Sequence, residues 1–244
     1  MSARHRFHVP EAAPGARLDL PDHSAHHARD VLRLRPGAEL RVFDGAGNEY
    51  EAVLEEVSKK RVLARLAGAV APRAEPALRI VLALPPLKGD RMELVIQKAT
   101  ELGVAEVWPV VTARTDAAGR PALQGSRQDR WEKVASGAAE QCGRAVVPRI
   151  APTATLDDLL ARPFDGARLV LVEDGAGVPP PAWPGGGSVM CLLGPAGGWE
   201  AVEVRRLEGA GFVHARLGPR ILRAETAAIA AVTAVQLLFG DLRD

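Results

Sequence analysis

The first seventy residues show the alternation of apolar and polar positions that is typical of β-strands. Residues 40–42 and 50–54 alternate in this way, and residues 45–48 between them read Gly-Ala-Gly-Asn. Two alternating runs joined by a glycine-rich turn predict a β-hairpin. A third run at residues 62–66 predicts another strand, and residues 24–34 have helix-like spacing. The pattern predicts a small β-rich domain.

A proline-containing linker at residues 69–76 follows, and the pattern then changes. Residues 80–84 are wholly apolar and predict a strand. After Asp90, apolar residues recur at spacings of three and four as far as Gly103. This predicts a helix that Asp90 caps and Gly103 ends. We place one domain at residues 1–72 and the second at 73–244.

Strand and helix patterns continue to alternate in the second domain. Residues 104–111 form a strand candidate in which Pro109 predicts an edge position or a shortened strand. Ser126 with Asp129 predicts a capping box for a helix that ends at Gly143. Thr155 with Asp158 starts a shorter helix, and residues 168–172 form another strand. The alternation predicts an α/β fold with a mostly parallel sheet that is covered on both faces.

The last two apolar runs, at residues 189–193 and 212–217, each end in a glycine-proline loop that leads into a helical pattern. The first loop reads Gly-Pro-Ala-Gly-Gly at 194–198, and the second begins Gly-Pro-Arg at 218. Open α/β sheets bind ligands at the carboxyl ends of their strands. Glycines let the backbone approach a ligand closely, and helix starts offer free N–H groups. The loops therefore predict a pocket that binds largely through main chain; the alternative is that these glycines only make turns.

Composition is that of an ordinary globular protein, with 47% hydrophobic and 25% charged residues among 244. Residues 1–10 have no apolar core for a signal peptide. The longest apolar run, residues 227–239, falls short of the roughly 20 residues that cross a bilayer. The two cysteines are far apart and form no CxxC pair. We expect a cytoplasmic protein without a membrane partner.

Charge is nearly balanced, at a formal +1, which argues against a protein that coats nucleic acid indiscriminately. Five of the six histidines fall in the first 27 residues, together with several arginines. Such local enrichment can bind phosphate, or it can be a solvated face. His23, His26 and His27 lack the H-E-x-x-H pattern and a downstream ligand cluster, so no metal is expected.

Several reaction classes lack their motifs. No G-x-G-x-x-G follows a strand, no G-x-x-x-x-G-K-[ST] occurs, and there is no G-x-S-x-G. Nicotinamide redox chemistry, P-loop phosphoryl transfer and α/β-hydrolase chemistry are therefore poorly supported.

Five segments occur in a characteristic order and are spread over most of the length of the second domain. They are Pro-Leu-Lys-Gly-Asp-Arg-Met-Glu at 86–93, Gln-Lys-Ala-Thr-Glu-Leu-Gly-Val at 97–104, Glu-Gln-Cys-Gly-Arg at 140–144, Leu-Gly-Pro-Ala-Gly-Gly at 193–198, and residues 217–227. With Arg-Phe-His-Val at 6–9 and Leu-Arg-Leu-Arg-Pro-Gly at 32–37, the chain resembles the RsmE-type ribosomal RNA methyltransferases of the SPOUT superfamily over essentially its whole length.

The resemblance implies a PUA-like β-barrel domain at 1–72 that binds RNA. It also implies a SPOUT methyltransferase domain at 73–244 with a C-terminal trefoil knot, which periodicity alone does not predict because true knots are nearly absent from proteins. The implied protein is a homodimer that uses S-adenosyl-L-methionine to methylate ring nitrogen 3 of a specific uridine in small-subunit (16S) ribosomal RNA, free or in the assembled small subunit. Cofactor contacts carry over to Leu193, Gly194, Pro195, Gly197, Gly198, Leu217, Gly218, Ile221, Leu222 and Arg223.

The chemistry of the implied reaction suggests catalytic residues. Uracil nitrogen 3 must lose a proton to become a good nucleophile, so a base or a stabilising cation would help. Glu225 is the candidate base, and Arg223 or Arg144, the latter from the partner subunit, is the candidate charge stabiliser. The alternative for Glu225 is that an acid in the first turn of a helix favours the helix dipole. The residues expected to contact RNA are Arg4, Arg6, Arg29, Arg33, Arg35, Lys88 and Arg91.

One position departs from the pattern. The family usually reads Gly-Pro-Glu-Gly-Gly, and this chain has Ala196 in place of the glutamate, with Glu200 nearby. We expect reduced or altered cofactor binding. Two other functions stay open: another SPOUT activity such as ribose methylation of transfer RNA, and a degenerate, non-catalytic RNA-binding protein.

Overall fold

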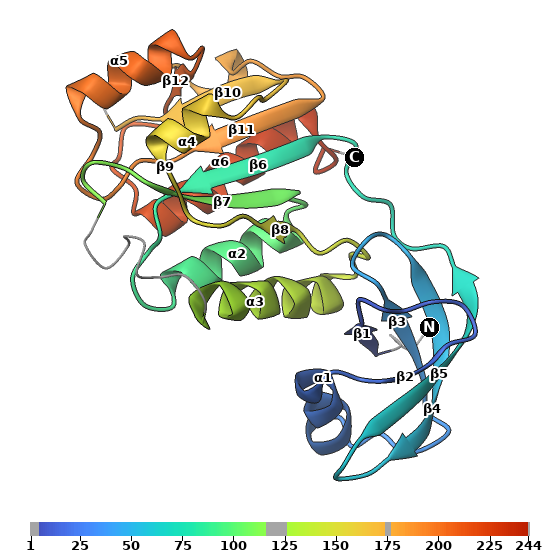
Figure 1. Ribbon diagram of the computed structural model, residues 1–244. Coiled ribbons are helices and arrows are strands. Elements are labelled where there is room, and N and C mark those ends of the chain that lie inside the picture. The colour runs from blue at the N-terminus through green and yellow to red at the C-terminus, as the bar shows by residue number, and fades with distance from the viewer. Residues whose placement is uncertain (1–4, 116–125, 174–176, 244) are drawn as a thin grey trace. The chain divides into compact units, whose positions relative to one another are not determined.

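The computed structural model describes residues 5–115, 126–173 and 177–243 (Figure 1). The chain divides into two compact units. Unit 1 comprises residues 1–75 with 136–147, and unit 2 comprises residues 76–135 with 148–244. The predicted division at residues 72 and 73 gives each domain one continuous stretch of chain, whereas unit 1 also includes residues 136–147, where a later helix ends.

Unit 1 is built on a five-stranded sheet with the order β1-β3-β4-β5-β2. Its strands are β1 (Arg6–His8), β2 (Arg17–Asp19), β3 (Glu39–Phe43), β4 (Glu49–Val57) and β5 (Val62–Val70). β1 is parallel to β3, and the other pairings are antiparallel. The predicted hairpin is confirmed, because β3 pairs with β4 across the glycine-rich turn.

The helical segment predicted at residues 24–34 lies at residues 22–31, so it begins and ends earlier than expected. It consists of α1 (Asp22–His26) and a π-helical turn, η1 (His27–Val31). Arg33 has a positive φ of 54°, a conformation that cannot continue a right-handed helix. Alternate strand residues such as Phe7, Leu40, Leu54 and Leu66 are buried in the core of unit 1. Burial of each such side chain contributes about 1.5–3 kcal/mol.

Unit 2 contains a parallel sheet with the order β12-β10-β11-β6-β7-β8, and β9 also pairs with β7. Its strands are β6 (Arg79–Leu84), β7 (Glu106–Val111), β8 (Arg149–Ile150), β9 (Ala154–Thr155), β10 (Ala167–Leu171), β11 (Ser188–Leu192) and β12 (Val213–Ala215). Its helices are α2 (Arg91–Glu101), α3 (Ser126–Cys142, which ends in unit 1), α4 (Leu156–Ala161), η4 (Pro180–Ala182, a 3₁₀ turn), α5 (Ala201–Gly209) and α6 (Ala224–Phe239). The predicted mostly parallel sheet is confirmed.

Helices cover both faces of this sheet. Val81 and Ala83 of β6 face a core that includes Leu156 and Leu159 of α4 and Leu207 of α5. The alternate β6 residues point to the opposite face, where α6 packs against β6, β11 and α2. In Figure 1, α4 lies in front of the sheet and α6 behind it. The trefoil knot stays a prediction.

The helix ends test the predicted caps. Gly103 follows α2 with a φ of 79°, as a C′ glycine should. Thr155 and Asp158 form the predicted capping box of α4. Asp90 occupies the N-cap position of α2, but its side chain does not cap; its carboxylate lies 3.4 Å from Arg130 instead. The side chain of Ser126 lies outside the described residues.

Pro109 is tolerated for a reason that the sequence did not predict. β7 is not an edge strand, because it pairs with β6 on one side and with β8 and β9 on the other. β8 pairs with Glu106 and Val107, and β9 pairs with Val110 and Val111. Pro109 lies in the gap between these two short partners, so its missing N–H interrupts neither of them.

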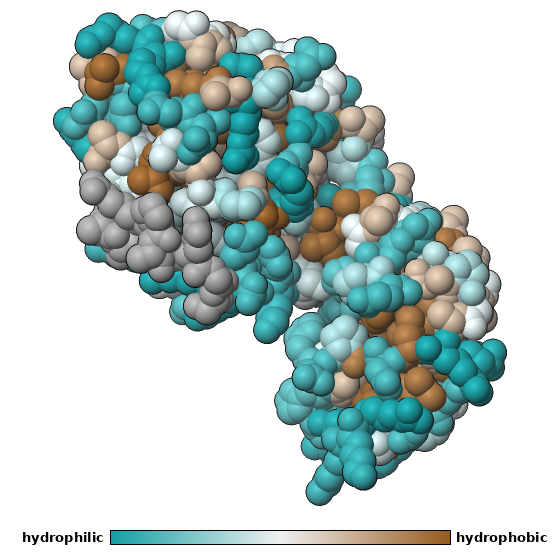
Figure 2. Space-filling view, in the orientation of Figure 1, coloured by the Kyte–Doolittle hydropathy of each residue, from teal (hydrophilic) through white to brown (hydrophobic). Residues whose placement is uncertain are grey.

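On the face drawn in Figure 2, hydrophilic side chains cover most of each unit and apolar side chains appear in small patches. Among the described residues, no helix is long and apolar enough to cross a bilayer.

Candidate cofactor pocket

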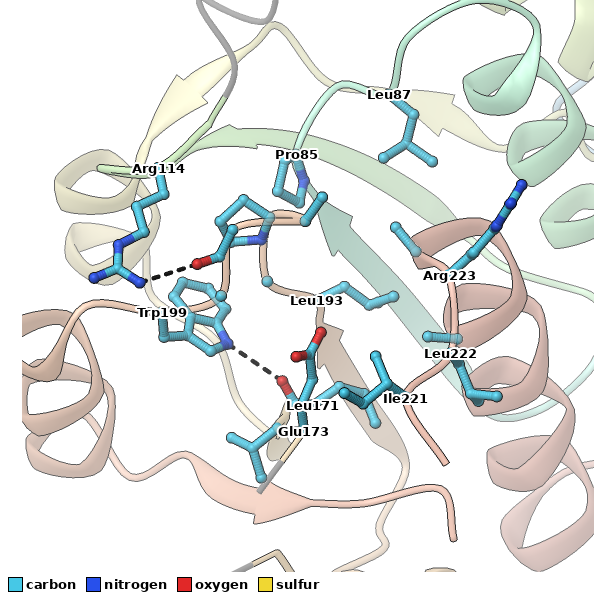
Figure 3. A pocket seen from close by; sticks show the side chains of 18 of the residues that line it. Pro85, Leu87, Arg114, Leu171, Glu173, Leu193, Trp199, Ile221, Leu222 and Arg223 are labelled. Atoms are coloured by element: carbon cyan, nitrogen blue, oxygen red, sulfur yellow. Dashed lines mark hydrogen bonds between the residues drawn. The ribbon is translucent and has the colours of Figure 1, made fainter. Parts of the chain in front are cut away.

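A pocket of about 660 Å³ lies in unit 2, where the carboxyl ends of the parallel strands meet (Figure 3). Its walls come from the segment after β6 (residues 85–88), the first loop (residues 193–199, after β11) and the second loop (residues 217–224, before α6). The end of β10 closes a further side. This is the edge of the sheet at which the sequence predicted a ligand site.

All the residues predicted to contact a cofactor line this one pocket. They are Leu193, Gly194, Pro195, Gly197, Gly198, Leu217, Gly218, Ile221, Leu222 and Arg223. They come from two loops that are far apart in the sequence. Parallel strand order brings the two loops to the same edge of the sheet.

Two glycines of the first loop, Gly194 and Gly198, are required by its geometry. A Cβ at Gly194 would lie 2.8 Å from the indole Nε1 of Trp199, closer than real Cβ atoms approach. The same indole N–H donates a hydrogen bond to the Leu171 carbonyl oxygen at 3.2 Å, which fixes the ring between β10 and the loop (Figure 3). Gly198 has a φ of 71°, which favours glycine. These glycines therefore make the turns and also form the pocket wall.

Arg114 anchors the first loop, and the sequence did not single it out. Its Nη1 donates to the Gly197 carbonyl oxygen at 3.0 Å (Figure 3), and its Nε lies 3.7 Å from Glu200 Oε1. Arg114 follows β7, so the rule that ligands bind beyond the carboxyl ends of strands could have indicated it. Glu200, the acidic residue near Ala196, thus lies beside Arg114.

Positive charge predominates among the described residues that line the pocket. The cationic side chains are Lys88, Arg91, Arg114, Arg220 and Arg223. Glu173 is the acidic residue among them, and it extends toward the middle of the pocket in Figure 3. Such a surface suits a polyanionic substrate at the pocket mouth.

The candidate catalytic residues are not gathered at one point. Arg223 is the N-cap residue of α6 and lines the pocket. Glu225 lies in the first turn of α6, outside the pocket lining, and its Oε2 is buried without a hydrogen-bond partner among the described residues. A buried carboxylate oxygen without a donor is costly, which marks Glu225 as a place for an incoming donor. Arg144 lies in unit 1, where its side chain is 11% exposed and its Nε donates to Glu75 at 2.8 Å.

Arg6 has a structural role in unit 1. Its guanidinium forms a bidentate pair with Glu49 (3.0 and 3.1 Å) and donates to the carbonyl oxygens of Ala139 and Arg144. It also lies over the ring of Phe43 and is 12% exposed. These partners occupy the donors that an RNA phosphate would need, and the contact of Arg6 with RNA stays a prediction.

The other residues expected to contact RNA differ in their exposure, their partners and their place in the structure. Arg33 and Arg35 are exposed in unit 1. Arg29 pairs with Asp30 and donates to the Ser58 carbonyl oxygen. Lys88 and Arg91 line the pocket in unit 2, and Arg4 lies outside the described residues.

Two of the family motifs, residues 6–9 and 140–144, contact each other in unit 1. Glu140 accepts a hydrogen bond from the His8 main-chain N–H at 2.8 Å, and His8 Nδ1 lies 2.8 Å from Ser136 Oγ. Burial raises the pKa of Glu140 and lowers the pKa of His8. Among the described residues, no group of three or more His, Cys, Asp and Glu side chains is placed to hold a metal ion.

Comparison with known proteins defines the class. Residues 74–236 match the family described as RNA methyltransferase domain, and residues 20–67 match RNA methyltransferase PUA domain. The chain is therefore an RNA methyltransferase-type α/β protein with a PUA domain. It belongs to the ribosomal RNA small subunit methyltransferase E family, because it is 32% identical to the Bacillus subtilis member over 88% of this chain and 90% of that protein.

Solved structures agree with this assignment. A Neisseria gonorrhoeae ribosomal RNA small subunit methyltransferase E bound to S-adenosyl methionine is 34% identical, with a TM-score of 0.88 over 98% of this chain and 99% of that one. A Legionella pneumophila methyltransferase in complex with the bound cofactor is 36% identical, with a TM-score of 0.91 over the same shares.

Proposed function

We propose that this protein uses S-adenosylmethionine to methylate ring nitrogen 3 of a uridine in 16S ribosomal RNA. The observation that carries the proposal is the glycine-lined pocket formed by the first and second loops. It lies in a chain that is 34% identical to the Neisseria gonorrhoeae enzyme, which is bound to S-adenosyl methionine. The choice of uridine nitrogen 3 rests on the family resemblance.

The residues present fit this cofactor. The pocket volume lies within the range of about 300–1,000 Å³ that is usual for small-molecule sites. Leu193, Leu217, Ile221 and Leu222 offer apolar surface to an adenosine group. The close approach of Trp199 to Gly194 gives the first loop a defined shape. Main-chain groups of both loops are the proposed polar partners.

The proposed mechanism assigns proton handling and charge to residues at the start of α6. When bound, the cofactor supplies an electrophilic methyl group on a sulfonium centre. Glu225 does not line the pocket and its Oε2 is buried, so the side chain must turn toward the bound base; Oε2 then takes the proton from uracil nitrogen 3, and the guanidinium of Arg223 stabilises the negative charge that develops on the ring. Arg144 could serve only by giving up its ion pair with Glu75. Positioning of the two reactants supplies most of the remaining rate.

Substrate RNA is proposed to meet the cationic mouth of the pocket. Lys88, Arg91 and Arg220 would contact phosphates, and Arg33 and Arg35 would add contacts from unit 1. A ring nitrogen used in pairing is accessible only when the base is unpaired or turned out of its stack. The substrate is therefore an exposed uridine of the free RNA or of the small subunit.

The proposed protein is a cytoplasmic homodimer. Leu94, Val202 and Leu237 are large apolar residues of unit 2 that are 41–51% exposed, and contact with a second copy would bury them. Sedimentation velocity at micromolar concentration should give twice the monomer mass of 25.9 kDa. A monomer mass would contradict this part of the proposal.

Product analysis tests the reaction and separates the alternatives. Protein, labelled S-adenosylmethionine and either 16S ribosomal RNA or transfer RNA are incubated, and the RNA is digested to nucleosides. We expect labelled 3-methyluridine from ribosomal RNA only. A label on ribose of transfer RNA would favour the other SPOUT activity. An absence of both label and cofactor binding would favour the RNA-binding module that Ala196 leaves open.

A further inference from the structure

The turn after β7 (residues 112–115) is joined to the first loop and to the start of α5 by two hydrogen bonds, and a third lies within the start of α5 itself. Arg114 donates to the Gly197 carbonyl oxygen at 3.0 Å. The Ala113 N–H donates to Glu203 Oε1 at 2.8 Å, and the Glu200 N–H donates to Glu203 Oε2 at 3.0 Å. Both carboxylate oxygens of one side chain thus bind main chain, one from each segment.

The contacts differ in strength because they differ in exposure. Glu203 is 4% exposed, so its two charge-assisted bonds are shielded from water. The pair between Arg114 and Glu200 is about half exposed and contributes little, because solvent screens it. The hydrogen bond from Arg114 to Gly197 is the contact that reaches the pocket wall. A Cβ at Gly197 would lie 3.4 Å from the Arg114 Cβ, so the arginine packs directly on this glycine.

Trp199 holds the end of the first loop through its indole hydrogen bond to the Leu171 carbonyl oxygen, and Arg114 holds the carbonyl of Gly197 in the middle of the loop. Ala196 offers only a methyl group and is exposed. A loop that must be ordered when its ligand arrives loses affinity to the entropy of ordering. An external anchor removes that cost before binding.

We propose that Arg114 and Glu203 are positioning residues for the cofactor, which hold the first loop in its binding geometry. Arg114 fixes the carbonyl of Gly197, and Glu203 fixes the turn that presents Arg114. The inference rests on the proposed function only in naming S-adenosylmethionine as the ligand. It assigns no contact with the reacting atoms to either residue.

Calorimetry with S-adenosylmethionine and S-adenosylhomocysteine tests this inference on the full chain. In Arg114→Ala, Kd for both ligands should rise by about tenfold, the value of one hydrogen bond of ordinary strength. The thermal midpoint should stay close to wild type. Arg114→Lys keeps the charge but not the planar fork, so it should recover only part of the affinity. Glu203→Gln keeps only one of the two acceptor oxygens, so it should also weaken the binding of both ligands.

A matched control removes an arginine of similar exposure away from the pocket. Arg149 is 65% exposed and pairs with Glu106, and it does not line the pocket. Arg149→Ala should bind both ligands as wild type does. In Arg114→Ala, the fold-decrease in kcat at saturating cofactor should be far smaller than the fold-increase in Kd, because the substitution impairs cofactor binding and not the chemical step.

Two outcomes would overturn the inference. Wild-type affinity in Arg114→Ala would mean that the loop holds its geometry without the anchor. A loss confined to one of the two ligands would mean that Arg114 acts on the methyl-bearing sulfur and not on loop order. Failure of the wild-type protein itself to bind S-adenosylmethionine would instead refute the proposed function.

Discussion

Individual arginines in this chain have different roles that their sequence context does not reveal. Arg6 and Arg144 both belong to motifs that identify the family, yet each is held by a carboxylate of unit 1, Glu49 and Glu75 respectively. Arg223 lies in a comparable motif and lines the pocket. The partners of Arg6 and Arg144 are tens of residues away in sequence, so local pattern could not distinguish a structural arginine from a functional one.

Glu225 provides the first prediction. Replacement by glutamine keeps the size of the side chain and removes the base, so kcat should fall by roughly 10²-fold or more, the usual contribution of a general base. Cofactor affinity should not change, since Glu225 does not line the pocket. Single-turnover rates across pH measure this. An unchanged rate and pH profile would leave Glu225 with only its effect on the helix dipole.

Glu140 gives a prediction about stability and pH. Burial raises its folded-state pKa, so its stabilising contribution is complete below the unfolded pKa and is lost as pH rises through the folded pKa. Glu140→Gln cannot ionise and keeps an oxygen for the His8 N–H. The free energy of unfolding of the variant, relative to wild type, should therefore increase between pH 4 and pH 7. Denaturant unfolding at several pH values measures it; a relative decrease over this interval would contradict it.

Ala196 gives the third prediction at this scale. The sequence alone predicts weakened cofactor binding at this departure. Because Arg114 already anchors Gly197 and the methyl group of Ala196 is exposed, we now expect Ala196→Glu to change Kd for S-adenosylmethionine by less than about threefold, the scale of a solvent-screened surface charge. Calorimetry measures the change. A gain of tenfold would show that the missing glutamate limits this protein.

At the scale of elements, the first loop depends on the close contact between Gly194 and Trp199. A methyl group at Gly194 would overlap the indole, so Gly194→Ala should displace Trp199 at a cost of about 1–3 kcal/mol. Kd for the cofactor should rise at least tenfold. The matched control is Gly209→Ala at the end of α5, where a Cβ meets open space. Calorimetry on both variants tests this, and equal affinities would contradict it.

Hydrophobic periodicity predicted the elements well, and tertiary context explains the exceptions. Strands such as β6 and helices such as α2 follow from local patterns of burial. Pro109 was misplaced to an edge because the gap between β8 and β9 exists only in the assembled sheet. Asp90 does not cap because its backbone, with φ −78° and ψ 1°, is not in the extended conformation that lets a capping side chain reach back to the helix. Arg114 was missed because its partner Gly197 is 83 residues away and no short motif joins them.

For the whole molecule, the sequence predicted both sheets. It did not predict which stretches of the chain belong to which unit. The alternation from residue 78 predicts the parallel sheet, and the order β12-β10-β11-β6-β7 then brings the first and second loops together. Residues 136–147 belong to unit 1 although they follow the first part of unit 2 in the chain. Contacts such as the hydrogen bond from the His8 N–H to Glu140 hold them there, and hydrophobic periodicity does not predict such contacts. The candidate pocket was therefore foreseeable from strand ends, whereas its anchor was not.

The central claim is methylation of one 16S ribosomal RNA uridine at nitrogen 3, and mapping the methyl group tests it most directly. Hypomethylated small subunits are incubated with the protein and S-adenosylmethionine, and the RNA is copied by reverse transcriptase. A methyl group on nitrogen 3 blocks pairing, so we predict a new stop at a single uridine that appears only with both protein and cofactor. No new stop, or a methyl group mapped to another atom or another RNA, would contradict the claim.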